Sequence, residues 1–531
     1  MAEPTAAAPR ALTDGFHNAT LADWIAVIAG SLGALMAMLD ISITNSALPL
    51  IQGEIGATGT EGTWISTGYL MSEIVMIPLA AWLTRVFGLR TFLLGSTLLF
   101  TAFSIMCGFA ESLPQMIIGR IGQGFAGGAL IPTAQTIVRT RLPPHQLPIG
   151  MTLFGLIVLI GPLLGPVLGG WLAEHISWSW CFFVNVPVGV ALVALLYAGL
   201  PKSAPDWHQF VYADWLGIVG LSAGLSSLTV VLEEGQRENW FDSPMIVWLS
   251  ILSVVGIATL IGAQFFARRP VVRLSLLTNK SYASIIFIVF TIGAAVYCVS
   301  YLLPQFLSNI AGYNAEQSGA IMLVSGLPAF ALTPILPRLL TRLDLRLMVV
   351  VGLLCFAVSC MLDITLTAQS VGHDFYASQL LRGVGQMFAM MPLNQASMSA
   401  VSREDAAEAA GLFNMARNLG GSVGLALLGV YIDRRNAFHD AVIRDSVTAN
   451  SLIGQDHIAA TSAGFLAQGG DKAYASMQSL GQLAAQMQQQ AAVITYSETF
   501  YVLGVTLLLS IPLALFLRRP RPGAARAYSG H

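Results

Sequence analysis

Long apolar stretches alternate with short polar segments along this chain, and this pattern is the strongest structural signal in the sequence. A helix needs about 20 mostly apolar residues to cross a bilayer, and fourteen stretches reach that length. We therefore predict fourteen transmembrane helices, near residues 24–49, 63–84, 91–110, 113–137, 149–172, 181–200, 214–232, 244–266, 282–304, 317–337, 347–367, 375–400, 409–433 and 492–517.

The composition agrees with an all-α integral membrane protein. Of the 531 residues, 55% are hydrophobic and only 10% are charged, whereas about a quarter of the residues of a soluble domain are charged. Residues 1–23 contain no short apolar region of the signal-peptide type, so the first span should be retained. The five cysteines lie in apolar stretches without a CxxC spacing, which predicts packing roles and no metal site.

The basic residues indicate how these helices are oriented. With the N-terminus placed in the cytoplasm, most of the 26 lysines and arginines fall in inner loops and tails, as the positive-inside rule requires. Arg237 is the only basic residue in a short outer loop. One miscounted span would invert this alternation, so the charges support fourteen spans with both termini in the cytoplasm.

Two short motifs indicate an internal repeat. "LTRVFGLR" (83–90) recurs as "LTRLDLR" (340–346), and "RIGQGFA" (120–126) recurs as "RGVGQMFA" (382–389). Each pair is eight spans apart, which predicts two six-helix halves separated by two extra helices. Repeated halves are typical of secondary transporters, whose substrate sites lie between them near the membrane midplane.

The repeat and the charges divide the chain into seven predicted segments. These are a cytoplasmic tail (1–23), an N-terminal six-helix bundle (24–200), two extra helices with their loops (201–280), the C-terminal bundle helices (281–433), a long outer loop with an amphipathic helix (434–491), the last helix (492–517) and a basic cytoplasmic tail (518–531).

Several motifs carry a family resemblance. They include "LDISITNSALP" (39–49), "RIGQGFAGG" (120–128), "WSWCFFVNVPVG" (178–189), "LEEGQRENWF" (232–241) and "GLFNMARNLGGSVG" (411–424). Over residues 24–517 the chain resembles the major facilitator superfamily, in particular its fourteen-span drug:proton antiporters and the Emr-type multidrug efflux permeases. The resemblance implies the major facilitator fold and proton-coupled efflux of hydrophobic or amphipathic drugs across a bacterial inner membrane. It also implies a tripartite pump with a periplasmic adaptor protein and an outer-membrane channel.

The loop between the second and third spans departs from the superfamily pattern. Its usual signature is Gly-x-Leu-x-Asp-Arg-x-Gly-Arg, but this chain reads "AWLTRVFGLR" (81–90). Ala81 replaces the first glycine, and Arg85 stands where an acidic residue is usual. The inner-gate salt bridge attributed to that acid therefore cannot be transferred to this chain.

The fifth span contains the stretch "GLIVLIGPLLGPVLGGWL" (155–172), which resembles the antiporter motif of drug exporters. Its glycines recur every four residues and so form one smooth helix face, while its prolines favour a bend. We predict that this face lets the two halves move against each other; the alternative is a tight static helix contact. The motif residues are Gly161, Pro162, Gly165, Pro166, Gly169 and Gly170.

Three ionisable residues fall at a similar depth in the N-terminal spans. Charged groups inside a bilayer are costly and so indicate function, and Asp40, Glu73 and Arg120 lie within one helical turn of the same layer. Asp40 and Arg120 match family positions linked to proton coupling, with a static buried ion pair as the alternative. Glu73 would carry protons or supply the countercharge for cationic drugs. Asp363 and Glu498 are expected at the membrane interface.

Other polar residues within the spans are predicted to tie helices together, to act in gating, or to line the substrate cavity. Arg382 is the repeat equivalent of Arg120, and three residues of span 13 share one helix face at spacing i, i+3, i+4. The full set is Asn45, Gln123, Arg382, Asn394, Asn414, Arg417 and Asn418.

The outer loop ends in "MQSLGQLAAQMQQQAAVIT" (477–495), where apolar residues follow a coiled-coil spacing. We predict a helix that runs into the last span, with Leu480 and Met487 on its seam. Two heptads are too few to be stable alone. The seam should pack against the mouth of the bundle, the membrane lipid, or the adaptor that the resemblance implies.

Other functions are less consistent with the sequence. A membrane enzyme would need a nucleophile or metal cluster, and the chain has no HExxH, paired-histidine or Walker motif. We expect no cofactor and no nucleic-acid partner. A dedicated exporter of one metabolite or siderophore stays open, as does a proton-coupled uptake symporter, because a largely apolar cavity selects by shape and amphipathicity.

Overall fold

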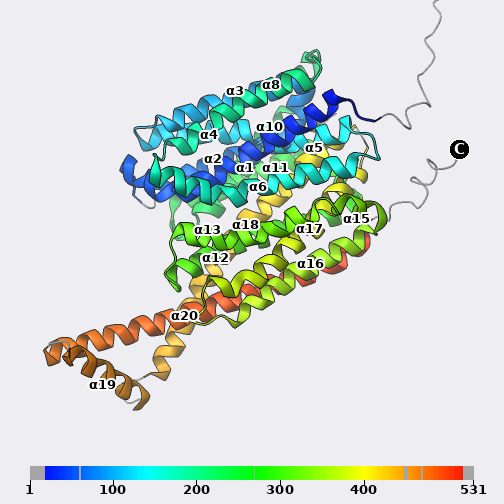
Figure 1. Cartoon of the computed structure of the whole chain (residues 1–531). Coiled ribbons are helices and arrows are strands. Elements are labelled where there is room, and N and C mark those ends of the chain that lie inside the picture. Colours follow the sequence, from blue (N-terminus) through cyan, green and yellow to red (C-terminus); the bar gives the residue numbers. More distant parts are fainter. Residues whose placement is uncertain are drawn as a thin grey trace, which may run out of the picture.

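The computed structural model describes residues 18–58, 61–267, 270–402, 404–447, 452–467 and 471–517. Within these ranges every regular element is a helix, which confirms the predicted all-α class. Residues 1–17 of the predicted N-terminal tail and the whole tail 518–531 lie outside the described part. Figure 1 shows the N-terminal helices, blue to cyan, packed beside the later helices, green to red.

The N-terminal half begins at Leu21 and ends at Gly199. Its helices are α1 (Leu21–Ile55), α2 (Trp64–Phe87), α3 (Leu89–Gly108), α4 (Leu113–Gly127), α5 (Leu130–Arg141), α6 (Leu147–His175), α7 (Trp180–Phe183) and α8 (Asn185–Gly199), with a short 3₁₀ turn, η1 (Glu61–Thr63), before α2. The fourth predicted span is divided at Gly128, where a Cβ atom would lie 2.6 Å from the carbonyl oxygen of Glu73. Glycine is therefore required where this span crosses α2.

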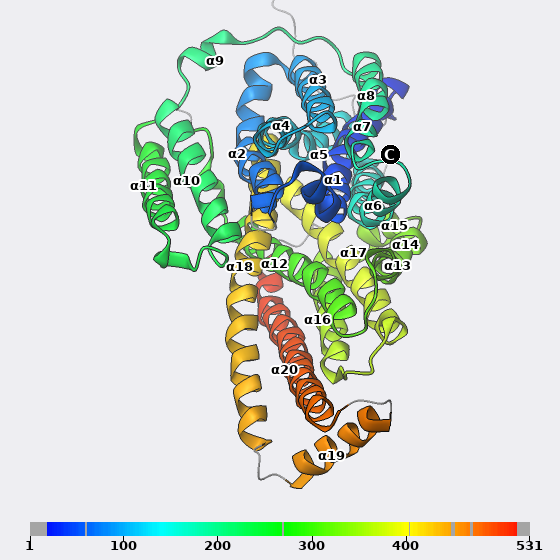
Figure 2. The ribbon, with the colours of Figure 1, turned by 90° about the vertical axis from the view of Figure 1, so that its left-hand side faces the viewer.

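Two extra helices follow and pack beside the bundle, as Figure 2 shows. They are α10 (Trp215–Glu234) and α11 (Pro244–Phe266), preceded by the short α9 (Trp207–Val211) and accompanied by η2 (Trp240–Asp242) and η3 (Leu274–Thr278). Gly220, Gly224 and Gly256 let the two backbones approach closely. The outer end of α10 reaches both α2 and α18, so this pair spans the boundary between the halves.

The C-terminal half begins at Lys280. Its helices are α12 (Lys280–Asn309), α13 (Ala315–Leu323), α14 (Leu327–Leu332), α15 (Leu336–Arg342), α16 (Leu345–Leu362), α17 (Tyr376–Ser399), α18 (Ala406–Ser446), α19 (Leu452–Ala467) and α20 (Lys472–Ser510), with the 3₁₀ turns η4 (Val324–Gly326), η5 (Asp363–Thr365), η6 (Gly372–Phe375) and η7 (Ile511–Phe516). The tenth predicted span is broken into three short helices in a segment that contains Pro328, Pro334 and Pro337.

Eleven helices in the described ranges are long and apolar enough to cross a membrane. The other three predicted spans correspond to α4 with α5, α13 to α15, and the polar helix α17. The count of fourteen spans is consistent with this arrangement and stays a prediction, as do the predicted segment boundaries.

The predicted outer loop is largely helical. Helix α18 does not end near residue 433 but continues to Ser446, and α20 runs unbroken from Lys472 to Ser510, which confirms a helix leading into the last span. At about 1.5 Å per residue, the 41 residues of α18 far exceed a hydrocarbon core of about 30 Å. The outer part of α18 (434–446), α19 and the first part of α20 (472–491) form the protrusion, which extends from one end of the bundle (Figure 1).

The glycine face of α6 packs against α1 inside the N-terminal half. A Cβ atom on Gly161 would contact Met38, one on Gly165 would lie 2.3 Å from Cβ of Ser42, and one on Gly169 would lie 2.6 Å from the backbone oxygen of Ile43. The smooth face is therefore not the surface between the halves that the sequence suggested. Proline side chains occupy another face of α6.

The side of α6 that carries Pro166 approaches the other half. Gly319 of α13 lies opposite Pro166 and Val167. Gly170 has open space around its Cα atom, so the motif residues do not share one environment. The role of the motif in antiport stays a prediction.

We predict that Gly169→Ala destabilises the protein, whereas Gly170→Ala, in the same helix, does not. A methyl group at residue 169 would overlap the α1 backbone, and overpacking of this kind costs about 1–3 kcal/mol. Thermal unfolding of the purified variants in detergent measures the difference. Equal transition temperatures for the two variants would contradict the close α1–α6 contact.

Candidate functional site

An arginine–carboxylate pair lies at the centre of the N-terminal half. Asp40 of α1 and Arg120 of α4 are both fully buried. The Nη1 atom of Arg120 donates to Oδ2 of Asp40 at 2.5 Å. The sequence predicted that these residues share one layer, and the structure places them in contact.

Amide side chains complete the coordination of the pair. Gln123 Nε2 donates to Oδ1 of Asp40 at 3.0 Å, and Asn185 Nδ2 donates to the same oxygen at 2.7 Å. Arg120 also donates to Gln123 Oε1 and to the backbone oxygen of Ile65. Both charges are thus held in a network from four polypeptide segments, as burial of an ion pair requires.

An aromatic ring covers the arginine. The guanidinium carbon of Arg120 lies 4.4 Å from the ring centroid of Tyr69 on α2, a distance suited to a cation–π contact. The hydroxyl of Tyr69 is buried and has no hydrogen-bond partner in the described residues. The arrangement shields the charge of Arg120 from water. Binding of a proton to Asp40 would remove the negative charge that the arginine pairs with.

Asn185 is a site residue that the sequence analysis did not single out. It is buried at the start of α8 and also hydrogen-bonds Ser104 at 2.9 Å. It lies inside the stretch "WSWCFFVNVPVG". A polar residue within this apolar family motif was the feature by which the sequence could have identified it.

Glu73 lies near this network but does not join it by a hydrogen bond. Its side chain is 1% exposed, and its Oε1 atom has no hydrogen-bond partner among the described residues. The charges that act on it are Arg417 of α18, Arg120 and Asp40. Glu73 is therefore a buried carboxylate that feels the charge of basic residues from both halves but forms no ion pair within 4 Å in the described residues.

The inner contact between the halves contains an ion pair of unexpected polarity. Arg85, at the cytoplasmic end of α2, pairs with Glu408 in the first turn of α18, whose side chain is 4% exposed. Gln209 of α9 accepts from Arg85 Nε at 3.2 Å and orients it. The acid of the usual loop motif is absent, but a salt bridge between the halves is present, with the basic residue on α2.

Further contacts strengthen this inner side. Asn414 of α18 donates to Gln135 of α5 at 2.8 Å, across the two halves. Arg273, in the segment before η3, pairs with Asp405. In this arrangement the inner ends of the halves are fastened together.

Two neighbouring glutamates of α10 bind different halves at the outer side. Glu234 accepts from Thr63 and Thr67 beside and within α2, at 3.1 and 2.5 Å. Glu233 accepts from Ser422 of α18 at 2.8 Å. The motif "LEEGQRENWF" contained both residues, but only the packing of α10 shows what they contact.

The remaining predicted polar residues are dispersed. Asn45 is exposed and accepts from Ser66 at 2.8 Å, and Arg417 contacts its neighbour Asn418 at 3.4 Å. Asn394 and Arg382 are buried on α17, each with an atom that lacks a hydrogen-bond partner in the described residues. No group of three or more metal-ligating side chains occurs in the described ranges.

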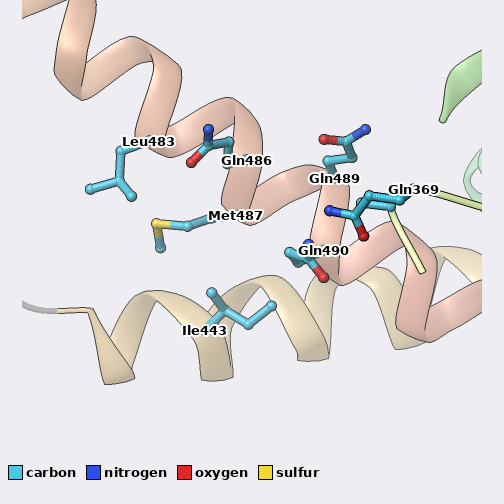
Figure 3. A pocket seen from close by; sticks show the side chains of 8 residues that line it. Gln369, Ile443, Leu483, Gln486, Met487, Gln489 and Gln490 are labelled. Atoms are coloured by element: carbon cyan, nitrogen blue, oxygen red, sulfur yellow. The ribbon is translucent and has the colours of Figure 1, made fainter. Parts of the chain in front are cut away.

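A cavity of about 430 Å³ lies between α18 and α20 in the protrusion. Figure 3 shows Met487 and Leu483 of α20 pointing toward Ile443 of α18, with glutamines around them. Leu480 is 52% exposed and Met477 is 72% exposed. The predicted seam is therefore divided: Met487 packs inside the protrusion, while Leu480 faces outward.

Comparisons with known proteins agree with this geometry. The sequence profile of the Major Facilitator Superfamily matches residues 30–425. The chain is 31% identical to the multidrug export protein EmrB of Escherichia coli K12, over 93% of this chain and 95% of that protein. It is 29% identical to the colistin resistance protein EmrB of Acinetobacter baumannii, over 93% and 96% of the two chains.

Solved structures show the same fold. A double tryptophan mutant of XylE superposes with a TM-score of 0.59, at 13% identity, over 95% of this chain and 98% of the other. The sequence profile covers both halves of the bundle and the EmrB relatives extend over the protrusion. This chain therefore belongs to the Major Facilitator Superfamily, and within it to the group of EmrB-type multidrug export proteins.

Proposed function

We propose that this protein exports hydrophobic or amphipathic drugs from the cytoplasm across a bacterial inner membrane in exchange for protons. The observation that carries the proposal is the buried Asp40–Arg120 pair with its complete set of hydrogen bonds. A membrane protein retains such a pair at high energetic cost. The names of the EmrB relatives support the direction of transport, because they are export and resistance proteins.

Proton exchange at Asp40 would change the partner of Arg120. A proton on the carboxylate removes its charge, so the guanidinium loses its main partner. Arg120 also acts electrostatically on Glu73, which is the next carboxylate available to it. A proton at Asp40 and a cationic drug at Glu73 would then compete through one arginine.

Alternating access requires the inner contact to open. The Arg85–Glu408 pair and the Asn414–Gln135 hydrogen bond join the halves on the cytoplasmic side. These contacts belong to a state that is closed toward the cytoplasm. Drug entry would break them, and their renewal would accompany release to the outer side.

The protrusion supports an association with a second protein. Met477 and Leu480 expose apolar side chains on α20 at a distance from the bundle. Contiguous exposed apolar surface outside the lipid region is typical of interaction sites, and these two side chains lie one helical turn apart on α20. We propose that a periplasmic adaptor with helical hairpins covers them and leads to an outer-membrane channel.

Narrower substrate ranges are compatible with the same site. A dedicated exporter would use the same pair of charges, and an uptake symporter would reverse the direction. A substrate panel in inverted vesicles separates these cases, because multidrug export predicts accumulation of several unrelated amphipathic compounds. Accumulation of a single compound would favour dedicated export.

We predict that Asp40→Asn abolishes drug uptake driven by a pH gradient in inverted vesicles but leaves drug binding measurable. The amide keeps the shape of the site and cannot exchange a proton. Glu54→Gln, which changes an exposed carboxylate of the same helix, is the matched control and should transport normally. Normal pH-driven uptake by Asp40→Asn would remove the coupling role.

A second prediction concerns the inner ion pair. Arg85→Glu and Glu408→Arg should each reduce transport about tenfold or more, because each leaves like charges in contact and costs at least about 1.4 kcal/mol. The double variant should recover most of the activity. The same exchange at Arg444 and Asp440, a pair on α18 in which the arginine is exposed and the aspartate is partly buried, should have no effect. Absence of recovery in the double variant would show that the two residues do not act as a pair.

A third prediction concerns the protrusion. Leu480→Glu should lower drug resistance in cells and leave transport in reconstituted vesicles unchanged, because the side chain contacts a partner and not the bundle. Gln482→Glu, an exposed position on the opposite face of α20, should leave both unchanged. Parallel losses in cells and vesicles would assign Leu480 to the permease itself.

A further inference from the structure

A second buried acid and a buried arginine act on each other electrostatically in the C-terminal half, without direct contact. Asp363 begins η5 at the outer end of α16, and Arg382 lies on α17; each is 5% exposed. The carboxyl of Asp363 is therefore covered by protein, and its predicted depth near the membrane interface stays a prediction. Its electrostatic partner is Arg382, the repeat equivalent of Arg120.

The depth of Arg382 matches that of Arg120 in the other half. Arg382 follows the start of α17 by six residues, and Arg120 follows the start of α4 by seven. At about 1.5 Å per residue the two arginines lie about 10 Å from the outer ends of their helices. The two arginines thus lie at a similar level, whereas Asp40 precedes the end of α1 by fifteen residues and Asp363 directly follows the end of α16.

The two arginines differ in the hydrogen bonds and ion pairs that they form. Arg120 and Asp40 are in contact, whereas the described residues contain no ion pair of Arg382 within 4 Å. The Nη1 atom of Arg382 is buried without a hydrogen-bond partner, and so is Oε1 of Gln379, one turn earlier on α17. A buried charged donor without a partner requires a functional or structural explanation.

Asp363 is buried without a contacting cation: the described residues contain no ion pair of its carboxyl within 4 Å. The nearby Ser378 hydroxyl, which acts on the carboxyl, donates to the backbone oxygen of Phe375 at 3.0 Å. This is an arrangement that a protonated carboxylic acid can adopt, because the neutral acid needs no contacting cation. The unpartnered nitrogen of Arg382 is then available to receive the carboxylate once the proton has left.

Few other titratable groups face Asp363. The thiol of Cys360 lies on the same helix, α16, and interacts with both Asp363 and Arg382. Helix α20 packs against η5, but its carboxylate Glu498 is bound by Arg435 and His439 of α18. Arg382 is therefore the cation placed to respond to the charge of Asp363.

We propose that Asp363 is a second proton-carrying residue of this transporter, with Arg382 as its charge partner, so that each half carries one proton per cycle. In the outward-facing state a carboxylate oxygen of Asp363 takes a proton from a hydronium ion of the outer water and leaves a water molecule. In the inward-facing state it returns the proton to water, and Arg382 binds the carboxylate. The inference rests on the proposed proton-coupled function.

The test measures how many protons are exchanged per drug molecule. Purified protein is reconstituted in liposomes, with the cationic dye ethidium as the transported probe, and the pH gradient that balances a set dye gradient is determined. We expect a ratio near two for the unchanged protein and near one for Asp363→Asn. Thr365→Ala, an exposed position in the same turn, should keep the original ratio.

The outcomes separate the inference from the proposed function. If the unchanged protein couples dye movement to protons and Asp363→Asn keeps the same ratio, the second proton site is refuted and the proposed function stands. If the unchanged protein shows no proton coupling, both fall together.

A measurement on the unchanged protein covers the case in which Asp363→Asn does not fold. Dicyclohexylcarbodiimide modifies protonated carboxyls in apolar surroundings, and mass spectrometry of peptides locates the adduct. We expect labelling of Asp363 that increases as the pH falls, with Glu498 unlabelled because it is held by Arg435. No labelling of Asp363 between pH 5 and 9 would overturn the proposal.

Discussion

The burial of Asp40 with Arg120 is the constraint on which the N-terminal half depends. An unpaired charge at this depth would be prohibitively costly, so α1, α4 and α8 must meet with their polar side chains aligned. Gln123 and Asn185 supply the donors that the carboxylate needs, and the Ile65 carbonyl accepts from the arginine. The glycine face of α6 then lets α1 lie close enough to place Asp40 in this network. Packing and charge pairing therefore support each other.

The contacts between the halves are distributed unevenly. On the inner side the pairs are charged and direct, while on the outer side the extra helix α10 mediates part of the contact through its two glutamates. One residue binds the N-terminal half and its neighbour binds the C-terminal half. Helix α10 thus connects the two halves on the outer side. When the halves move apart there, at least one of the two glutamate contacts must break.

The sequence alone was sufficient to predict the fold class, the family and the Asp40–Arg120 layer. The length of the apolar stretches, the alternation of basic residues between loops and the position of each charge within its span can all be read along the chain. The sequence was not sufficient for contacts that depend on which helix lies beside which. The glycine face of α6 was predictable as a face, but its partner, α1, was not. The pairing of Arg85 with Glu408 joins residues that are far apart in sequence, and the burial of Asp363 depends on how α17 and α20 cover the end of α16. Asn185 was visible within a motif, but its partner Asp40 was visible only in three dimensions.

The long helices α18 and α20 give the molecule a mechanical property that its core does not have. They are continuous from inside the bundle to the tip of the protrusion, and Arg435 of α18 binds Glu498 of α20 through two hydrogen bonds at 2.7 Å near its base. Two helices that are joined by a salt bridge bend less than one helix alone. A small tilt of the C-terminal half therefore becomes a larger sideways displacement at the tip of the protrusion. The protrusion can therefore act as a lever, and any protein that holds its tip would register the state of the transport cycle as a change of position.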